Sequence, residues 1–479
     1  AARKKFVVEG SKDFDCAYVY ANMVGCDGGR LIFDGGNLIA ARGEILVSGP
    51  RLVFKDVLLT SCDLDVGSVT KTKGSSFHKD PGNTPDEPQV IHSSFVLKET
   101  DTPLANQELQ EWQNSQSLKL EEFSRAVALG LFDYIRKSKS NGCVVSLSGG
   151  ADSSAVAVLL NLMVQLGISE LGMPGFLASF SHFDKLRDCK STRECTQELI
   201  TCVYQSTRNS GAVTLMSATN LAEAIGANFI CLDVDSFFQG YVSVVEKAIG
   251  SKINWSSHDV ALQNIQARVR APGIWLIANL KKALLLATSN RSEAAVGYAT
   301  MDGDTCGGLS PIAGIDKAFL REWLLWMEQV GPKGVGAFPS LEAVNSQEPT
   351  AELRPPAALQ TDEADLMPYV VLDRIERLAI RDKLGPISVF RELSSFFSGT
   401  YGSDQLACWV KRFYRLWSIN QWKRERYAPS FHLDDLNLDP KTWCRFPILS
   451  GNFETELEEF DQYLKTSGGD GSFDLDADG

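Results

Sequence analysis

The stretch from Cys143 to Leu160 constrains the fold more than any other part of the chain. It reads CVVSLSGGADSSAVAVLL: a short β-branched run, two glycines and then apolar residues at helical spacing. A run of this kind bounded by glycine predicts a buried strand of a parallel sheet, followed by a tight loop and a helix. Gly149 and Gly150 can adopt backbone conformations that bring the loop close to a ligand.

The residues around these glycines suit a phosphate group. A helix that opens directly after the loop points free N–H groups and the positive end of its dipole at whatever lies above it. The hydroxyls of Ser148, Ser153 and Ser154 add donors, and the carboxylate of Asp152 suits Mg²⁺. No Gly-Lys-Ser/Thr follows, so this is not a Walker loop. A glycine turn before a serine-capped helix is the purely structural alternative.

The composition is that of an ordinary globular enzyme with room for two or three domains: 479 residues, 44% hydrophobic and 22% charged. A net charge of -13 argues against a nucleic-acid partner and a general membrane-surface role. Eleven cysteines without a C-x-x-C pair, and five histidines, suggest neither a zinc site nor a disulfide framework. We therefore expect reduced thiols and a cytoplasmic location, with no membrane span or signal peptide. The start at Ala1, without methionine, suggests a cut, processed or incompletely sequenced N-terminus.

Residues 1–67 have the pattern of an antiparallel sheet. Short apolar runs are separated by glycine turns, at 17–20, 31–33, 37–40, 44–47 and 56–59. Asp34-Gly35-Gly36 and Arg42-Gly43-Glu44 resemble hairpin turns. Residues 68–117 are polar and rich in proline, which is typical of an interdomain linker, and Leu118 to Ser138 then has helical spacing.

From residue 143 onward, runs typical of strands alternate with helical ones. Strands are predicted at 176–179, 229–232 and 283–288, and a helix over 194–206. This alternation predicts an α/β fold with a doubly wound parallel sheet, in a domain of residues 118–465, and with ligands at the carboxyl ends of the strands. Residues 466–479, rich in Gly and Asp, are predicted to be a disordered tail.

A second dense stretch runs from Leu262 to Asp304. Arg268 and Arg270 fall on a predicted helix that ends near Pro272, where a solvated helix face is the alternative to a binding role. The apolar run before Thr288 places this residue at a strand's carboxyl end, and Asn290-Arg291-Ser292-Glu293 opens a short helix. Residues 298–308 then form a Gly- and Asp-rich loop.

These motifs carry a family resemblance. SGGADSS resembles the pyrophosphate loop of the ATP pyrophosphatase superfamily, whose members cleave ATP to AMP and pyrophosphate. The later motifs NIQAR, ATSNRSEAAVGYAT, GLSPIAGIDK and EPTAEL, in this order, are similar to those of NAD synthetases, and NQWKRERYAPSFHL is similar to the end of the long, glutamine-dependent form. YANMVG and RLIFDGGNLIAARGEILVSGP resemble the last third of a nitrilase-like glutaminase domain, so residues 1–67 look like the C-terminal remnant of such a domain.

The resemblance implies roles for individual residues. ATP would be bound by Ser146, Leu147, Ser148, Gly149, Gly150, Ala151, Asp152, Ser153, Thr288, Lys317 and Thr350. Deamido-NAD would be bound by Arg268, Glu293, Tyr298, Ala299, Thr300, Met301 and Lys423. Asp152 and Glu293 would hold Mg²⁺, and Asp152 and Lys317 would be catalytic. Short ammonia-dependent relatives have lysine where Met301 stands and aspartate where Gly308 stands, so those two contacts do not transfer. For Lys423 a solvent-facing helix end, and for Thr350 a turn hydroxyl, are the alternatives.

The resemblance also implies the reaction: deamido-NAD is adenylated by ATP, and ammonia then displaces AMP to leave NAD. In the long form, ammonia comes from glutamine through a Glu, Lys and Cys site, which this chain lacks, so we expect it to use free ammonia. Cys16 and Cys26 are expected to be structural. The family suggests a homo-oligomer. Another ATP pyrophosphatase, such as a tRNA-modifying enzyme, and a non-catalytic nucleotide-binding subunit are the rival interpretations.

Overall fold

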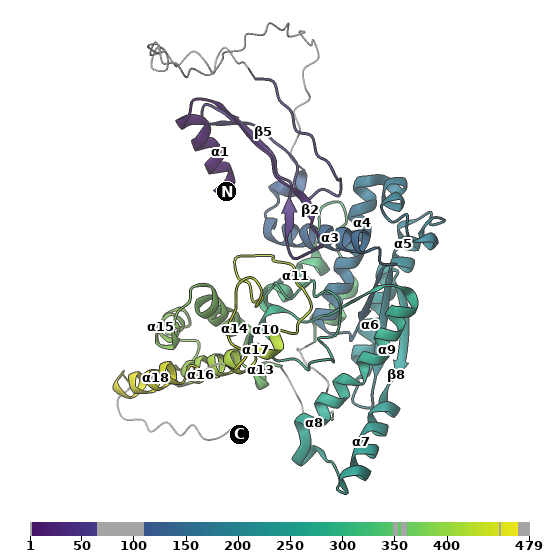
Figure 1. The fold of residues 1–479 in the computed structure, drawn as a ribbon, viewed down its shortest axis with the longest axis vertical. Helices are drawn as coiled ribbons and strands as arrows, with labels where there is room; N and C mark the ends of the chain where they lie inside the picture. The colour runs from purple at the N-terminus through teal and green to yellow at the C-terminus, as the bar shows by residue number, and fades with distance from the viewer. Residues whose placement is uncertain (1, 65–109, 348–352, 356–361, 450–451, 468–479) are drawn as a thin grey trace, which may run out of the picture. The chain divides into compact units, whose positions relative to one another are not determined.

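The computed structural model describes residues 2–64, 110–347, 353–355, 362–449 and 452–467 (Figure 1). They divide into two units, residues 1–25 with 33–118 and residues 26–32 with 119–479. Thr350, most of the predicted linker and most of the predicted tail lie outside the described residues.

The first unit contains a helix packed on a three-stranded antiparallel sheet. Helix α1 (Ala2–Asp13) contacts β1 (Ala17–Tyr20), β4 (Leu38–Ala41) and β5 (Glu44–Ser48), and the strand order is β1-β4-β5. Arg42 and Gly43 join β4 to β5 with φ of 57° and 83°, as a two-residue hairpin requires, so the hairpin predicted there is confirmed. The sequence prediction missed α1, because only Val7 and Ser11 of this helix are buried.

The hairpin predicted at Asp34-Gly35-Gly36 is wrong. Strand β3 (Ile32–Asp34) pairs with β2 (Val24–Cys26) in a separate sheet, while β4 belongs to the three-stranded one. Asp34 serves instead as an anchor that accepts hydrogen bonds from Arg3, Arg51 and Asn22. Burial opposes its ionisation, but the bonds and charges of the two arginines lower the pKa of Asp34 to about 2. The strand predicted at 56–59 is also wrong, since that segment is irregular.

The second unit is built on a four-stranded, all-parallel sheet in the order β8-β7-β6-β9. The strands are β6 (Cys143–Ser146), β7 (Ile200–Ser206), β8 (Asn228–Asp233) and β9 (Leu284–Leu286). Strands β6 to β8 are added on one side and β9 on the other, so the sheet is doubly wound, as predicted, with its switch point between β6 and β9. Ligands are expected at that point, beyond the carboxyl ends of these two strands.

Helices cover this sheet. They are α3 (Leu118–Ser138), which confirms the predicted helix, α4 (Ala151–Ser179), α5 (Thr192–Leu199), α6 (Ala212–Ile225), α7 (Asp235–Ile249), α8 (Trp255–Arg268) and α9 (Arg270–Lys281). Val144, Val203 and Leu285 pack against Ile274 and Ala278 of α9. Neighbouring strand residues point to the opposite face, and α4 contacts β6 and β7.

The structure differs from the sequence prediction in three further elements. Residues 176–179 are not a strand but the end of α4, which bends at Gly172 and keeps Phe176 fully buried. The helix predicted over 194–206 is α5 followed directly by β7, whose β-branched residues begin at Ile200. The predicted helix end at Pro272 is wrong, because α8 ends at Arg268 and Pro272 lies in the first turn of α9, where proline is tolerated.

Helix α4 is long and apolar enough, by length and composition, to cross a membrane. The sequence prediction of no membrane span did not allow for this helix. Residues Val156 to Leu160 of α4 are entirely buried in the structure, between the sheet and helices α5, α6 and α11. Burial in the protein core therefore accounts for its apolar character.

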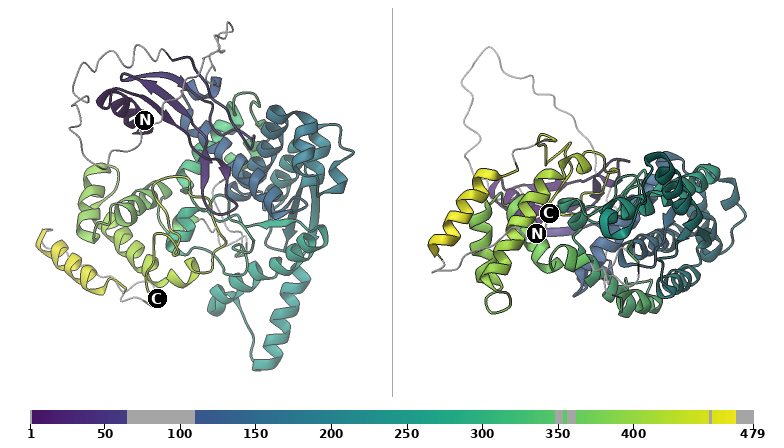
Figure 2. Two further views of the ribbon diagram at one scale, coloured as in Figure 1. Left: turned by 45° about the horizontal axis from the view of Figure 1, so that its top comes forward. Right: turned by 90° about the horizontal axis from the view of Figure 1, so that it is seen from below.

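The rest of the second unit is mostly helical. It comprises η2 (Asp184–Leu186), α10 (Arg291–Val296), α11 (Lys317–Gln329), η3 (Pro339–Leu341), α12 (Glu342–Asn345), α13 (Asp362–Asp365), α14 (Tyr369–Glu376), the π-helical turn η5 (Arg377–Arg381), α15 (Pro386–Phe396), α16 (Ser403–Ile419), α17 (Gln421–Arg424) and α18 (Glu454–Ser467). The short helix η1 (Glu111–Asn114) belongs to the first unit. Helices α14, α15, α16 and α18, green to yellow in Figure 2, share one core with α10. This core supports the short helix α10, which follows the end of β9.

The short segment 26–32 is built into the second unit. The N–H of Cys26 donates to Asp133 of α3 at 2.6 Å, and Arg30 forms an ion pair with Asp439. The side chains of Ile32 and Phe431 both lie against Gly130, so closely that a Cβ on this glycine would lie 2.8 Å from Ile32 Cδ1 and 3.0 Å from Phe431 Cζ. The segment thereby joins α3 to the C-terminal loop.

Candidate active site

The loop after β6 has the conformation that its glycines allow. Gly149 has φ of 84°, and a Cβ there would lie 2.1 Å from the carbonyl oxygen of Thr214, so only glycine fits. Gly150 is the N-cap of α4, and no side chain caps this helix among the described residues. The hydroxyl of Ser153 accepts from Ser148 N and donates to Gly150 O, so it shapes the loop. The first turn of α4 is left available to a ligand.

The loop after β9 lies beside it and is connected to it by a hydrogen bond. Asn290 caps α10 by accepting from Glu293 N at 2.9 Å, as the predicted short helix requires. Its side-chain amide also donates to Asp152 Oδ1 at 2.9 Å. Asp152 and Glu293, which are far apart in the sequence, are thereby held at one place.

Lys317 completes this group of charges. It is the first residue of α11, is 2% exposed, and its ammonium forms ion pairs with Asp152 and, at 3.4 Å, with Glu293. Burial alone would lower the pKa of Lys317, but the two carboxylates raise it overall. The pKa of Glu293 is raised well above its ordinary value by burial and by the neighbouring charge of Asp152, against the effect of Lys317. One ammonium is thus shared by two carboxylates.

A cavity of about 230 Å³ lies above these residues. Of the predicted positions, it is lined by Ser146, Ser148, Gly150, Ala151, Asp152, Ser153, Thr288, Glu293, Tyr298 and Lys317. Leu147 and Gly149 do not line it: Leu147 is buried in the core, and Gly149 is packed against Thr214. The structure therefore brings most of the predicted ATP residues to one place.

The other predicted substrate residues lie around the loop after α10. Lys423 donates to the carbonyl oxygens of Gly297 and Ala299 at 2.6 and 2.9 Å, and Arg268 Nε donates to Met301 O at 3.0 Å. Thr300 Oγ1 donates to Asn264, and Met301 is buried. Both cations thus hold the loop in shape. They use only one or two of their N–H groups for this purpose.

Several cavity residues were missed by the sequence analysis. Asp304 lies in the Gly- and Asp-rich loop and accepts a hydrogen bond from Thr300 N. Burial raises the pKa of Asp304 to about 6. Gln205 and Ser289 also line the cavity, and Gln205 donates to Ser146 Oγ at 3.2 Å. Gln205 lies near the carboxyl end of β7, a signal that the predicted helix over 194–206 concealed.

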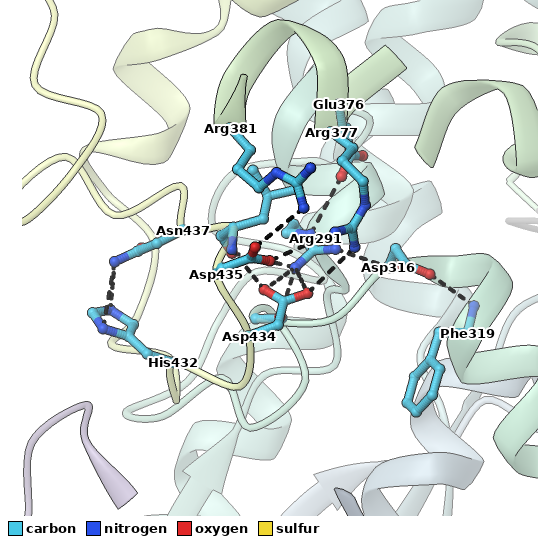
Figure 3. A network of polar contacts seen from close by, with 12 residues as sticks. Arg291, Asp316, Phe319, Glu376, Arg377, Arg381, His432, Asp434, Asp435 and Asn437 are labelled. Atoms are coloured by element: carbon cyan, nitrogen blue, oxygen red, sulfur yellow. Dashed lines mark hydrogen bonds and ion pairs between the residues drawn. The ribbon is translucent and has the colours of Figure 1, made fainter. Parts of the chain in front are cut away.

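Arg291 links this site to the helical part of the unit (Figure 3). Its side chain is 1% exposed and donates to Asp316 at 2.9 Å, Asp434 at 2.8 Å and Glu376 at 3.3 Å. The pKa of Glu376 is raised well above its ordinary value by burial and by Asp373, against the effect of Arg291. Arg291 therefore fixes α10 to the N-cap of α11, to α14 and to the C-terminal loop.

The comparison with known proteins agrees with this geometry. The family model for NAD synthase matches residues 123–394, more than half of the chain. The chain belongs to the NAD synthase family. This family assignment confirms the resemblance found in the sequence.

Individual relatives support the same assignment. The chain is 29% identical to a glutamine-dependent NAD(+) synthetase of Oryza sativa subsp. indica, over 95% of this chain and 64% of that protein, and 30% identical to that of Mus musculus, over 90% and 62%. It thus spans a little under two thirds of these curated relatives. The crystal structure of a glutamine-dependent NAD(+) synthetase from Cytophaga hutchinsonii is similar, with a TM-score of 0.76 and 42% identity over 96% of this chain and 68% of that one.

Proposed function

We propose that this chain is a ligase that amidates deamido-NAD to NAD and converts ATP to AMP and pyrophosphate. The observation that carries the proposal is the uncapped first turn of α4 next to Lys317, which lies between Asp152 and Glu293. A helix N-terminus and a buried ammonium are complementary to a triphosphate. The membership in the NAD synthase family supports the choice of reaction.

In this proposal, the phosphates lie over residues 146–153, and Thr288 and Lys317 contact the same nucleotide. Asp152 and Glu293 are suited to hold Mg²⁺, because their oxygens are hard ligands and both carboxylates lie within reach of the same ammonium. The ion would neutralise charge on the phosphates when bound. We also keep Thr350, on the strength of the sequence motif, as an ATP contact.

Deamido-NAD would occupy the side of the cavity formed by Tyr298 to Met301. The N–H groups of Arg268 and Lys423 that do not bind loop carbonyls would donate to it. Its nicotinate carboxylate attacks the α-phosphate of ATP, and the bond to pyrophosphate breaks. Ammonia then attacks the carboxyl carbon of the adenylate, and AMP leaves. The residues contribute mainly by holding the two substrates in line and stabilising charge.

Asp304 is our candidate for the proton acceptor in the second step. It lines the cavity, and a pKa near 6 keeps its carboxylate ionised at neutral pH while making it a better base than an ordinary aspartate.

We also propose that the whole protein draws ammonia from glutamine, as the names of its relatives state of them. Residues 1–67 would belong to the end of a nitrilase-like domain, followed by a linker over 68–117 and the synthetase domain over 118–465. The homo-oligomer and the cytoplasmic location stay predictions.

The test is to incubate the purified chain with deamido-NAD and Mg-ATP, with ammonium or with glutamine, and to follow NAD and pyrophosphate separately. We expect both products in equal amounts with ammonium, and none with glutamine from the polypeptide of residues 1–479. Pyrophosphate release that needs tRNA, or ATP binding without any pyrophosphate, would support a rival function.

A further inference from the structure

The first turn of α11 is held by side chains of α10 and α14 and by the helix's own N-cap. Lys317 N donates to Ser292 Oγ of α10 at 3.0 Å, Ala318 N donates to Asp373 Oδ2 of α14 at 2.9 Å, and Phe319 N donates to the N-cap residue Asp316 at 2.8 Å. A helix start is commonly satisfied by one capping residue and water. Here the start of α11 is fixed in position relative to α10 and α14.

Asp373 is the residue that joins these elements. Its Oδ1 accepts from the hydroxyl of Ser292, and its Oδ2 accepts from Ala318 N. Ser292 is fully buried and passes the connection on, because the same hydroxyl oxygen accepts from Lys317 N. One carboxylate therefore sets where α10 and α11 meet.

The group that this arrangement places is the ammonium of Lys317. Its neighbours Asp152 and Glu293 belong to α4 and α10, so its position depends on how α11 is held against those two helices. Asp373 itself is absent from the lining of the cavity. We propose that Asp373, acting through Ser292 and the first turn of α11, is a positioning residue that sets the Lys317 ammonium against the nucleotide. This inference rests on the proposed function, because it takes Lys317 as a phosphate contact.

The variant Asp373→Ala removes both hydrogen bonds, whereas Asp373→Asn can still accept from Ala318 N and can donate to Ser292 Oγ. We expect the alanine variant to lose about tenfold or more in kcat, since small displacements of a catalytic group have large effects on rate. The asparagine variant should recover most of this loss. Ser292→Ala should resemble Asp373→Ala, and the two substitutions together should cost little more than either alone.

The decisive measurement is a double-mutant cycle with Lys317→Met. If Asp373 acts through the ammonium, Asp373→Ala should change kcat by less than about twofold once that ammonium is gone. An undiminished loss in the Lys317→Met background would overturn the proposal. A role in stability alone is tested by Tyr414→Phe, which removes a buried hydrogen bond to Leu384 O within the same helical core. If Tyr414→Phe lowers the melting temperature as much as Asp373→Ala does, it should still keep the kcat of the parent chain.

The dissociation constant of Mg-ATP is also measured by calorimetry for each variant of the same cycle. Asp373→Ala should weaken Mg-ATP binding in the parent chain and leave it unchanged in the Lys317→Met background. Equal weakening in both backgrounds would sink the inference. If the parent chain binds Mg-ATP but converts no deamido-NAD, the proposed function fails. The binding measurements then still test the positioning role of Asp373.

Discussion

The side-chain amide of Asn290 donates a hydrogen bond to the carboxylate of Asp152 at 2.9 Å. This single bond joins the loops that follow β6 and β9, the two strands at the switch point of the sheet. The same asparagine caps α10 and thereby places Glu293. The two carboxylates around Lys317 are thus held by the packing of the loops before any ligand binds.

Asp152→Asn tests the charge at the centre of the site. We expect pyrophosphate release from Mg-ATP and deamido-NAD to fall by about 100-fold or more, as for other groups that stabilise developing charge. The fold should be retained, because the amide can still contact Asn290. Asp184→Asn, at an exposed position, is the control and should keep full activity. Undiminished pyrophosphate release from Asp152→Asn would remove this carboxylate from the mechanism.

Gly149→Ala tests the shape of the phosphate loop. The new methyl group would collide with the carbonyl of Thr214 in a backbone conformation that alanine avoids, so we expect a loss of about 1–3 kcal/mol in the free energy of unfolding. Gly150→Ala is the matched control. Gly150 has φ of -86°, and its Cβ would meet only Ser148 Oγ at 3.5 Å. Thermal unfolding of both variants gives the comparison, and equal melting temperatures would contradict it.

Arg291→Met tests the buried network of Figure 3. Removing the guanidinium leaves Glu376, Asp316 and Asp434 without their shared partner, and breaking a buried pair in this way costs roughly 3–5 kcal/mol. Arg381→Met removes two more exposed ion pairs, with Asp382 and Asp435, each worth about 0–1 kcal/mol. Denaturant unfolding should separate the two variants clearly. Similar losses from both would show that the network does not stabilise the fold as described.

Asp304→Asn tests the raised pKa of this residue. A carboxyl group with a pKa of about 6 in the folded chain, against the ordinary value of 3.8, binds its proton more tightly when folded. Its ionisation therefore lowers stability as the pH rises through this interval, and the full cost is present above pH 6. We expect Asp304→Asn to raise the melting temperature relative to the parent chain at pH 8, and the difference to disappear near pH 4. Asp188→Asn, at an exposed position, should give no such difference.

The sequence predicted the centre of the site better than its edges. The loop 146–153, Thr288 and the N-cap at Asn290 were found because strand ends, glycines and capping residues have local signatures. Gln205 was missed since β7 follows α5 without a break, so that one helix was predicted over both. The roles of Lys423 and Arg268 in holding carbonyl groups depend on contacts over long sequence distances, which no local pattern reports.

The network around Arg291 was also beyond the reach of local patterns. Its partners come from residues 316, 376 and 434, and nothing near Arg291 distinguishes it from a surface arginine at the start of a helix. The same holds for Asp373, whose two hydrogen-bond partners Ser292 and Ala318 lie on α10 and α11. Helix α1 was missed for the opposite reason, because its own sequence is mostly polar and only Val7 and Ser11 are buried.

The close approach of Ile32 to Gly130 has a practical consequence for dissecting this protein. A shortened version that begins at Leu118 would lack the strip of chain that contacts both α3 and the C-terminal loop. The carboxylates of Asp133 and Asp439 would lose their bonds to Cys26 and Arg30 at the same time. A truncated version should therefore keep the glycine-rich peptide 26–32 together with the rest of the second unit, either in place or as a separate fragment.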